Sequence, residues 1–118
     1  MMRNRHAPHI NFEELNGLLG KIVPSNLDMV LEHRDRFLIG EWKRDGEKVS
    51  LGQEILLKAF AKMPNFTVII VQGDTDDRMR VDKFWRINRV GNCVKAGCSL
   101  DELKDFITEW YLSTEFPT

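Results

Sequence analysis

The spacing of hydrophobic residues in the first half of the chain predicts a short helix followed by a β-hairpin. Residues 12–19 place their apolar side chains on one face of a helix, and Gly20 is a typical residue for its end. Residues 27–32 and 36–43 are expected to form two strands, because each is a short run rich in apolar residues. The polar residues between these runs favour a tight turn, so the two strands would pair as a hairpin.

The second half of the chain predicts a helix, two strands and a final helix. Ser50 is a suitable N-cap for a helix that runs to about Met63, where Pro64 prevents its continuation. Residues 66–72 are almost continuously apolar and β-branched, which is typical of a strand that is covered on both faces. Residues 79–90 alternate in polarity and are also expected to form a strand. Its apolar side would carry Met79, Val81, Trp85 and Ile87.

The clearest helical pattern lies near the end of the chain. Ser99 and Glu102 have the spacing of a capping box, in which each side chain bonds the backbone amide of the other residue. The apolar face of the helix that follows comprises Leu100, Leu103, Phe106, Ile107, Trp110 and Tyr111. The succession of elements predicts one small α/β domain over residues 1–118 with a mixed sheet, in which residues 1–10 form a loose arm.

Composition places the chain among ordinary globular proteins of a single domain. The 118 residues are 42% hydrophobic and 30% charged, and the formal net charge is −1. Near-neutrality excludes a nucleic-acid affinity that is driven by overall positive charge, although a local basic patch remains open. The two cysteines are expected to be free thiols in a reducing compartment. Because no apolar run is long enough for a membrane span or a signal peptide, we expect no membrane association and a cytoplasmic location.

The predicted hairpin brings two carboxylates together. If its turn is Arg34-Asp35, or the four residues around it, paired positions sum to 69 and Asp28 lies directly opposite Glu41. Directly opposed side chains have Cβ atoms about 5 Å apart, so two carboxylates there repel each other. A divalent cation between them would reverse the sign of this interaction, and oxygen ligands suit Mg²⁺ or Mn²⁺. A turn of three or five residues would destroy this register.

Lys43 adds a positive charge to the same hairpin. Side chains alternate along a strand, so Glu41 and Lys43 point to the same face. Taken singly, Asp28 is compatible with a turn, Glu41 with a solvated strand position, and Lys43 with an ion-pair partner. Together at the end of an apolar strand they favour a functional site, because charged groups in such surroundings need a partner or a role.

The hairpin pattern resembles the motif of the PD-(D/E)xK nuclease superfamily, which includes restriction enzymes, Holliday-junction resolvases and repair nucleases. Glu41-Trp42-Lys43 follows Asp28 at a distance of thirteen residues and matches the Glu-x-Lys part of that motif. The core of the superfamily is a helix, a three-strand meander, a helix and a strand. Residues 12–72 match this order if Lys21-Ile22-Val23 supplies the first strand. The residue before Asp28 is Leu27, where many members have proline.

The resemblance implies a Mg²⁺-dependent nuclease with a restriction-endonuclease-like α/β fold, in which a mixed sheet is flanked by helices, with an extra strand and a C-terminal helix. Asp28 and Glu41 would hold the metal, with the backbone carbonyl of Trp42 as a further ligand, and Mn²⁺ could replace Mg²⁺. Lys43 would orient the attacking water or help to deprotonate it, and would stabilise charge on the phosphate. The implied reaction is hydrolysis of DNA phosphodiester bonds by an endonuclease of DNA repair, recombination or the processing of phage and other mobile DNA. The number of metal ions stays open.

Two further positions are candidates for the site. Gln53 falls on the apolar side of the helix that begins after Ser50, at the end nearest to Glu41-Trp42-Lys43. It has two explanations, because it completes a capping box with Ser50, and because several superfamily members have Gln or Glu at this place, which implies a catalytic role. Glu14, or its neighbour Glu13, resembles an acidic residue that many members add to the metal site. A favourable charge at the positive end of a helix is the alternative explanation.

Basic residues gather in two stretches of the chain, which predict contacts with the DNA backbone. Phe84 and Trp85 lie within the second stretch, which Lys95 ends. The acidic residues that balance this charge are expected elsewhere, in the turn at 74–77 and on the last helix. A solvated strand face with Trp85 in the core is the alternative. The candidate phosphate-binding residues are Arg34, Arg36, Arg44, Lys48, Arg78, Arg80, Lys83, Arg86 and Arg89.

Two other classes of function remain open from the sequence: a nuclease-like domain that binds DNA without cutting it, and a protein-interaction domain. A homodimer would suit symmetric cutting of two strands, and a nucleoid-associated location would suit a DNA substrate. DNA binding that is absent or insensitive to salt would favour the protein-interaction domain.

Overall fold

The computed structural model describes residues 12–22 and 24–115 of the chain. The arm expected at residues 1–10 and Val23 lie outside the described residues. The elements in chain order are η1 (Glu13–Leu15), β1 (Met29–His33), β2 (Arg36–Lys43), α1 (Leu51–Ala61), β3 (Phe66–Asp74), β4 (Arg80–Ile87), β5 (Cys93–Gly97) and α2 (Leu100–Glu115).

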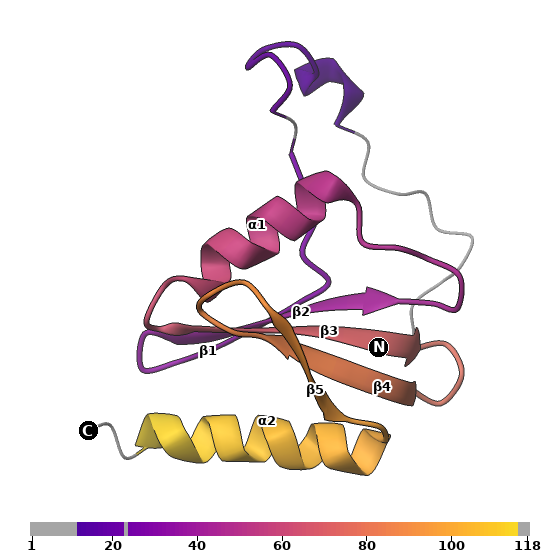
Figure 1. Ribbon diagram of the computed structural model, residues 1–118, viewed down its shortest axis with the longest axis vertical. Coiled ribbons are helices and arrows are strands. Elements are labelled where there is room, and N and C mark those ends of the chain that lie inside the picture. The colour runs from indigo at the N-terminus through magenta and orange to yellow at the C-terminus, as the bar shows by residue number, and fades with distance from the viewer. Residues whose placement is uncertain (1–11, 23, 116–118) are drawn as a thin grey trace.

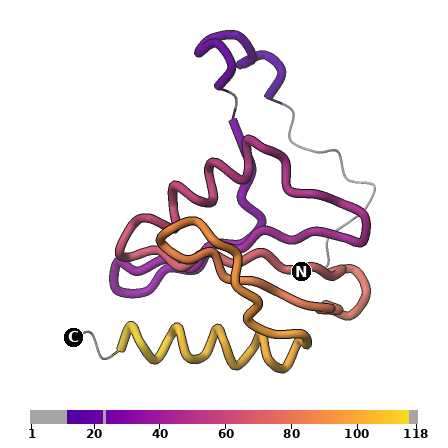
Figure 2. Tube along the Cα trace, in the orientation of Figure 1, coloured from indigo at the N-terminus to yellow at the C-terminus, as the bar shows by residue number. Residues whose placement is uncertain are grey.

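The strands form one five-stranded mixed sheet in the order β1-β2-β3-β4-β5. Neighbouring strands are antiparallel except β2 and β3, which are parallel and are joined by α1. A parallel pair needs such a crossover connection, and here the crossover places α1 on one side of the sheet while α2 covers the other (Figure 1). Figure 2 shows the same path as a continuous trace. The predicted α/β class, with a mixed sheet flanked by helices, is confirmed.

The β1–β2 hairpin has the register on which the predicted site depends. Its turn consists of residues 34–35, whose φ angles of 53° and 63° are both positive, as a two-residue type I′ turn requires. The pair Met29↔Gly40 confirms that paired positions sum to 69. The next positions outward are Asp28 and Glu41. The two-residue turn that the predicted register requires is therefore the one that forms.

The sheet has a hydrophobic core on each side, and β3 contributes to both. Leu57 of α1 belongs to one core together with Val68, and Leu103 of α2 belongs to the other together with Ile69. Neighbouring residues of β3 are therefore buried on opposite sides, as its continuous apolar sequence predicts. These two sides are the α1 face and the α2 face of the sheet.

The helix predicted over residues 12–19 is wrong in length, because only the single turn of η1 forms. Leu15 and Leu19 are 44% and 69% exposed, so the amphipathic face is not buried in either core. Short helices take most of their stability from such burial. Gly17 has a φ of 87°, which interrupts the helical path. Figure 1 shows η1 beyond α1, away from the sheet.

One predicted strand is wrong, and one observed strand was not predicted. The strand expected at Lys21-Ile22-Val23 does not join the sheet within the described residues, where Ile22 instead forms an isolated bridge with Leu19. β5 is a strand that the sequence pattern does not predict, because its residues are mostly exposed and do not alternate clearly.

β4 is confirmed as a strand, but its predicted apolar side is wrong. The register with β3 shifts between Gln72 and Gly73, which is the mark of a β-bulge. As a result Val81 and Phe84 both lie in the core of the α2 face, whereas Ile87 lies in the core of the α1 face. Phe84 is fully buried, so its ring is not available to a nucleic acid.

The bulge predicts a strong requirement for glycine at position 73. A Cβ atom there would overlap the backbone carbonyl oxygen of Arg80. Gly73→Ala is therefore expected to lower the free energy of unfolding by about 1–3 kcal/mol, as overpacking of a core does. Urea denaturation followed by circular dichroism measures the change.

Gly52 provides the matched control, because it lies in α1 with open space at its Cβ position. Gly52→Ala is expected to leave the unfolding free energy unchanged or to raise it by up to about 1 kcal/mol. Equal effects of the two substitutions would contradict the assignment of a close backbone contact to Gly73.

Candidate active site

Asp28 and Glu41 lie at the end of the β1–β2 hairpin that is opposite to its turn. Asp28 immediately precedes β1, and its Oδ2 accepts a hydrogen bond of 2.8 Å from the backbone amide of Trp42. The Asp28 side chain therefore hydrogen-bonds the backbone of β2 at the point where β1 begins. Asp28 and Glu41 are one position beyond the last pair of the hairpin, Met29↔Gly40, and the charge of Asp28 acts on the Glu41 carboxyl.

Glu41, Lys43 and Gln53 form a closed polar triangle. Lys43 Nζ lies 3.0 Å from Glu41 Oε1 and donates a hydrogen bond of 2.9 Å to Gln53 Oε1. Gln53 Nε2 donates a hydrogen bond of 2.8 Å to the same Oε1 of Glu41. All three groups thus have partners, which is the condition under which charged side chains persist in a nearly buried position.

The capping box of α1 holds Gln53 in this position. Ser50 Oγ accepts a hydrogen bond of 3.2 Å from the backbone amide of Gln53, and the Ser50 amide donates one of 3.4 Å to Gln53 Oε1. Gln53 therefore completes the capping box and also hydrogen-bonds the side chains of Lys43 and Glu41. Its Oε1 serves Ser50 and Lys43, while its Nε2 is directed to Glu41. The first turn of α1 is tied in this way to the end of β2.

Burial dominates the electrostatics of Glu41, which is only 3% exposed. Loss of hydration raises the pKa of this carboxyl above its ordinary value, because the charged form is the one that water stabilises. The hydrogen bond from Lys43 opposes the rise, and the negative charge of Asp28 adds to it. Ionisation of Glu41 therefore costs free energy, and a cation bound by both Glu41 and Asp28 would offset this cost.

Asp28, Glu41 and the backbone carbonyl of Trp42 are the groups that could hold a divalent cation. In the described part of the chain, no group of three or more His, Cys, Asp and Glu residues is placed to hold a metal ion. Two carboxylates still suit Mg²⁺, which usually keeps several of its own waters and takes one or two carboxylates from the protein. The donor set fits a cation because the nearly buried Glu41 has a second carboxylate, Asp28, beside it.

Glu14 is not brought to this cluster by any contact among the described residues. It is exposed on η1, as is its neighbour Glu13, and η1 lies beyond α1 from the sheet (Figure 1). The side chains that the structure brings together are Asp28, Glu41, Lys43 and Gln53.

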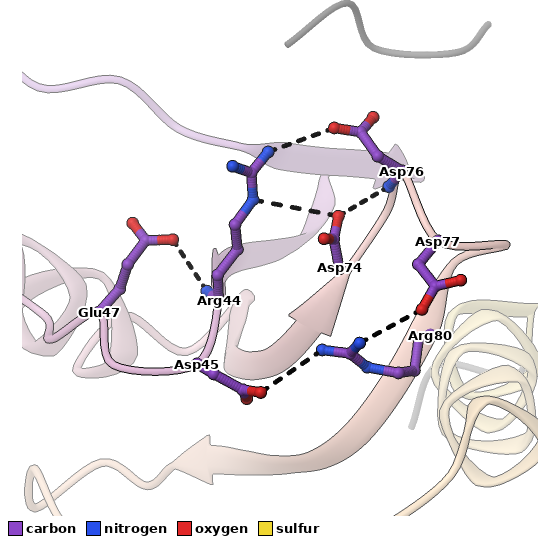
Figure 3. A network of polar contacts seen from close by, with 7 residues as sticks. All are labelled: Arg44, Asp45, Glu47, Asp74, Asp76, Asp77 and Arg80. Atoms are coloured by element: carbon purple, nitrogen blue, oxygen red, sulfur yellow. Dashed lines mark hydrogen bonds and ion pairs between the residues drawn. The ribbon is translucent and has the colours of Figure 1, made fainter.

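Arg44 and Arg80, two of the expected phosphate-binding residues, are held by carboxylates (Figure 3). Arg44 Nη2 lies 3.2 Å from an oxygen of Asp76, and Arg44 Nε lies 3.9 Å from one of Asp74. Arg80 Nη1 lies 3.2 Å from an oxygen of Asp77. The expectation that the acidic turn at 74–77 lies apart from the basic stretches is wrong, because pairing of β2, β3 and β4 brings them together.

The other expected phosphate-binding residues are divided among several places. Arg34 and Arg36 lie at the hairpin turn, at the far end of β2 from Glu41, and Arg34 also pairs with the end of α2. Arg86 belongs to the α2 face, because it is paired with Ile69. Loop positions are occupied by Lys48, Arg78 and Arg89.

Sequence reasoning missed that Lys83 and Trp85 share the α1 face with Glu41. Lys83 Nζ lies 5.5 Å from the centroid of the Trp85 ring, so the two side chains are on one side of β4. Trp85 pairs with Ile70, which packs against the core of the α1 face. Only the pairing of β3 with β4 shows that Lys83 and Trp85 lie on the α1 face. This pairing could not be predicted from the sequence, because the bulge changes the register.

No protein-family model, curated protein or solved structure matches this chain. The geometry of the site therefore carries the functional argument. Among the described residues, no helix has the length and apolar character that crossing a membrane requires.

The raised pKa of Glu41 predicts a specific dependence of stability on pH. The folded state binds the carboxyl proton more tightly than the unfolded state, whose pKa is near the ordinary 4.5. The stability that this proton contributes is present below that value and is lost as the pH rises through the folded-state pKa. Glu41→Gln removes the titration, so its unfolding free energy relative to that of the native sequence should increase with pH.

Urea denaturation of both proteins between about pH 4 and pH 8, without divalent cations, measures this difference. Glu54→Gln on the exposed face of α1 is the control, and its difference from the native sequence should not follow the same rise. A stability difference for Glu41→Gln that is constant or falls with pH would contradict the electrostatic assignment.

Proposed function

We propose that this protein is a Mg²⁺-dependent nuclease that hydrolyses DNA phosphodiester bonds. The observation that carries the proposal is the nearly buried Glu41, set against a second carboxylate and bonded to both a lysine and a glutamine. A structural ion pair needs one carboxylate and one cation. The second acid, Asp28, raises the cost of the arrangement and is explained if the pair binds a cation.

The order of elements around the site supports the same proposal. A hairpin, a crossover helix and a strand parallel to β2 follow one another, as in the core of the PD-(D/E)xK superfamily that the sequence resembles. A strand before β1 and a longer first helix would complete that core, and neither forms within the described residues. Membership of the superfamily, the restriction-endonuclease-like fold and a role in DNA repair, recombination or mobile-DNA processing are parts of the proposal.

In the proposed reaction a water oxygen forms a bond to phosphorus and the bond to the leaving sugar oxygen breaks. A metal held by Asp28, Glu41 and the Trp42 carbonyl would acidify the water and offset charge on the phosphate. Lys43 Nζ, beside Glu41 Oε1, would orient the water and donate to a phosphate oxygen as negative charge develops there. Gln53 is a positioning residue, because it holds Glu41 and Lys43 in their mutual geometry.

Metal binding should be measurable as a gain in stability. At ten times its dissociation constant, Mg²⁺ is expected to raise the unfolding free energy by about 1.4 kcal/mol, because it binds the folded state alone. Asp28→Asn should abolish the gain by removing a ligand charge. Asp101→Asn, at an exposed carboxylate on α2, should keep it. Thermal denaturation with and without Mg²⁺ tests this, and an equal gain in all three proteins would contradict a site at Asp28.

Loss of cleavage in single variants tests the catalytic assignment. Glu41→Gln and Asp28→Asn are expected to reduce Mg²⁺-dependent cleavage to background, because each removes a ligand charge. Lys43→Met is expected to lower the cleavage rate by about 10²–10³-fold, the usual effect of removing one donor to a developing oxyanion. Plasmid nicking and cleavage of labelled branched and linear DNA provide the measurement.

Lys62→Met is the matched control, because Lys62 is an exposed lysine at the opposite end of α1 from Gln53. It should retain the native rate. Cleavage that survives unchanged in Asp28→Asn, Glu41→Gln and Lys43→Met would show that the activity belongs to another site or to a contaminant.

A DNA-binding domain that does not cut is the second candidate. The observation that favours it is the closure of the triangle, since Lys43 and Gln53 already bond Glu41 Oε1 without any substrate. Under this alternative, DNA binds with the same affinity to the native protein and to Glu41→Gln, and Mg²⁺ produces no cleavage. If cutting occurs, two active sites in a homodimer would suit cleavage of both strands.

A further inference from the structure

The register of the sheet places a row of side chains beside the candidate active site, all on the α1 face. Glu41 of β2 pairs with Ile70 of β3, Ile70 pairs with Trp85 of β4, and Trp85 pairs with Lys95 of β5. Paired residues of neighbouring strands point to the same side of a sheet. One line of four side chains therefore runs from the buried carboxylate to the outer strand.

A second row lies next to the first, towards the ends of β2 and β3. It comprises Lys43, Gln72 and Lys83, which are paired in the same order. Lys83 is exposed and its Nζ lies 5.5 Å from the centroid of the Trp85 ring, which is itself half-buried. Lys95, which pairs with Trp85 across β4 and β5, is also exposed. An indole is thus flanked by lysines on the side of the sheet that holds Glu41.

We propose that this part of the α1 face binds a single-stranded stretch of DNA, with Trp85 stacking on one unpaired base and Lys83 and Lys95 contacting phosphates. Partly exposed aromatic rings between basic side chains on a sheet are the usual means of holding unpaired nucleotides. The inference rests on the proposed function, because it supplies the path by which a substrate phosphate reaches Glu41 and Lys43.

The positions agree with the spacing of a nucleic-acid strand. Trp85 and Glu41 lie two strands apart, which is about 10 Å at the usual distance of about 4.8 Å between strands. A stacked strand rises about 3.4 Å per nucleotide, so a base on Trp85 would lie about three nucleotides from the phosphate at Glu41. The proposed substrate therefore has unpaired nucleotides next to the cleaved bond, as a flap, a frayed end or a branched DNA has.

Charge and chemistry favour this occupant over a duplex or a protein. The ring of Trp85 can stack only on a base whose face is free, which a continuous duplex does not offer. Asp45 is already engaged, because it accepts a hydrogen bond from Gln72 and pairs with Arg80; Figure 3 shows the pair with Arg80. Lys83 and Lys95 are exposed, and their positive charges would attract a polyanion to this region.

The test is a binding titration of the full chain with fluorescein-labelled oligo(dT) of about twelve nucleotides and with a duplex of equal length, in EDTA so that no cleavage occurs. Trp85→Ala is expected to weaken binding of the single strand by about 5- to 150-fold, the range found for the loss of one stacking side chain. Binding of the duplex should change by less than about twofold. Trp85→Phe should restore most of the affinity, because a ring remains.

Two lysine variants, one on each side of the sheet, test which side binds the single strand. Lys83→Ala should weaken single-strand binding and reduce the slope of log affinity against log salt by about one phosphate contact. Lys104→Ala removes the same charge from the exposed surface of α2, on the other side of the sheet, and should leave both quantities unchanged. Circular dichroism and thermal denaturation confirm that each variant is folded.

Equal losses in Lys83→Ala and Lys104→Ala, equal effects of Trp85→Ala on single strand and duplex, or no binding of either DNA would each overturn the inference. Because the titration contains no metal, its result is independent of catalysis. Single-strand binding that depends on Trp85 without any cleavage supports the inference and contradicts the nuclease proposal. Cleavage by a protein whose single-strand binding does not depend on Trp85 supports the nuclease proposal and contradicts the inference.

Discussion

Burial of the Glu41 carboxylate is the constraint on which the rest of the structure depends. A carboxylate that is 3% exposed must keep its hydrogen bonds, and here a lysine two residues away and a glutamine from a helix supply them. Gln53 reaches Glu41 only if the first turn of α1 lies against the end of β2. The crossover from β2 to β3 is thereby fixed at its start, and burial of Leu57 in the same hydrophobic core as Val68 fixes it further along.

The hairpin and the triangle could be predicted from the sequence because their determinants are local. A two-residue turn and a period of two are enough to set Asp28 opposite Glu41, and both are visible in the sequence. The capping box places Gln53 on the helix face that looks towards the sheet. Its two functions do not compete, because an amide group offers an acceptor to Ser50 and Lys43 and a separate donor to Glu41.

Features that depend on pairing between distant strands could not be predicted in the same way. The bulge at Gly73 shifts one residue out of register, so Val81 joins Phe84 on the α2 face against the expected alternation. β5 is short and exposed, and its pairing with β4 rather than its own composition makes it a strand. The short η1 shows the converse: an amphipathic pattern does not form a full helix where its apolar face is left exposed.

The net charge of −1 acquires a physical meaning once the pairs are known. Arg44 forms ion pairs with Asp74 and Asp76, and Arg80 forms one with Asp77. These arginines hold the ends of the strands together and are therefore poor candidates for phosphate contacts. Transfer of these arginines to a phosphate would leave the carboxylates without their partner cations, which costs free energy. Charge is therefore neutralised locally where β2 and β3 end and β4 begins. The proposed single-strand contact rests instead on Lys83 and Lys95, which are exposed on the α1 face.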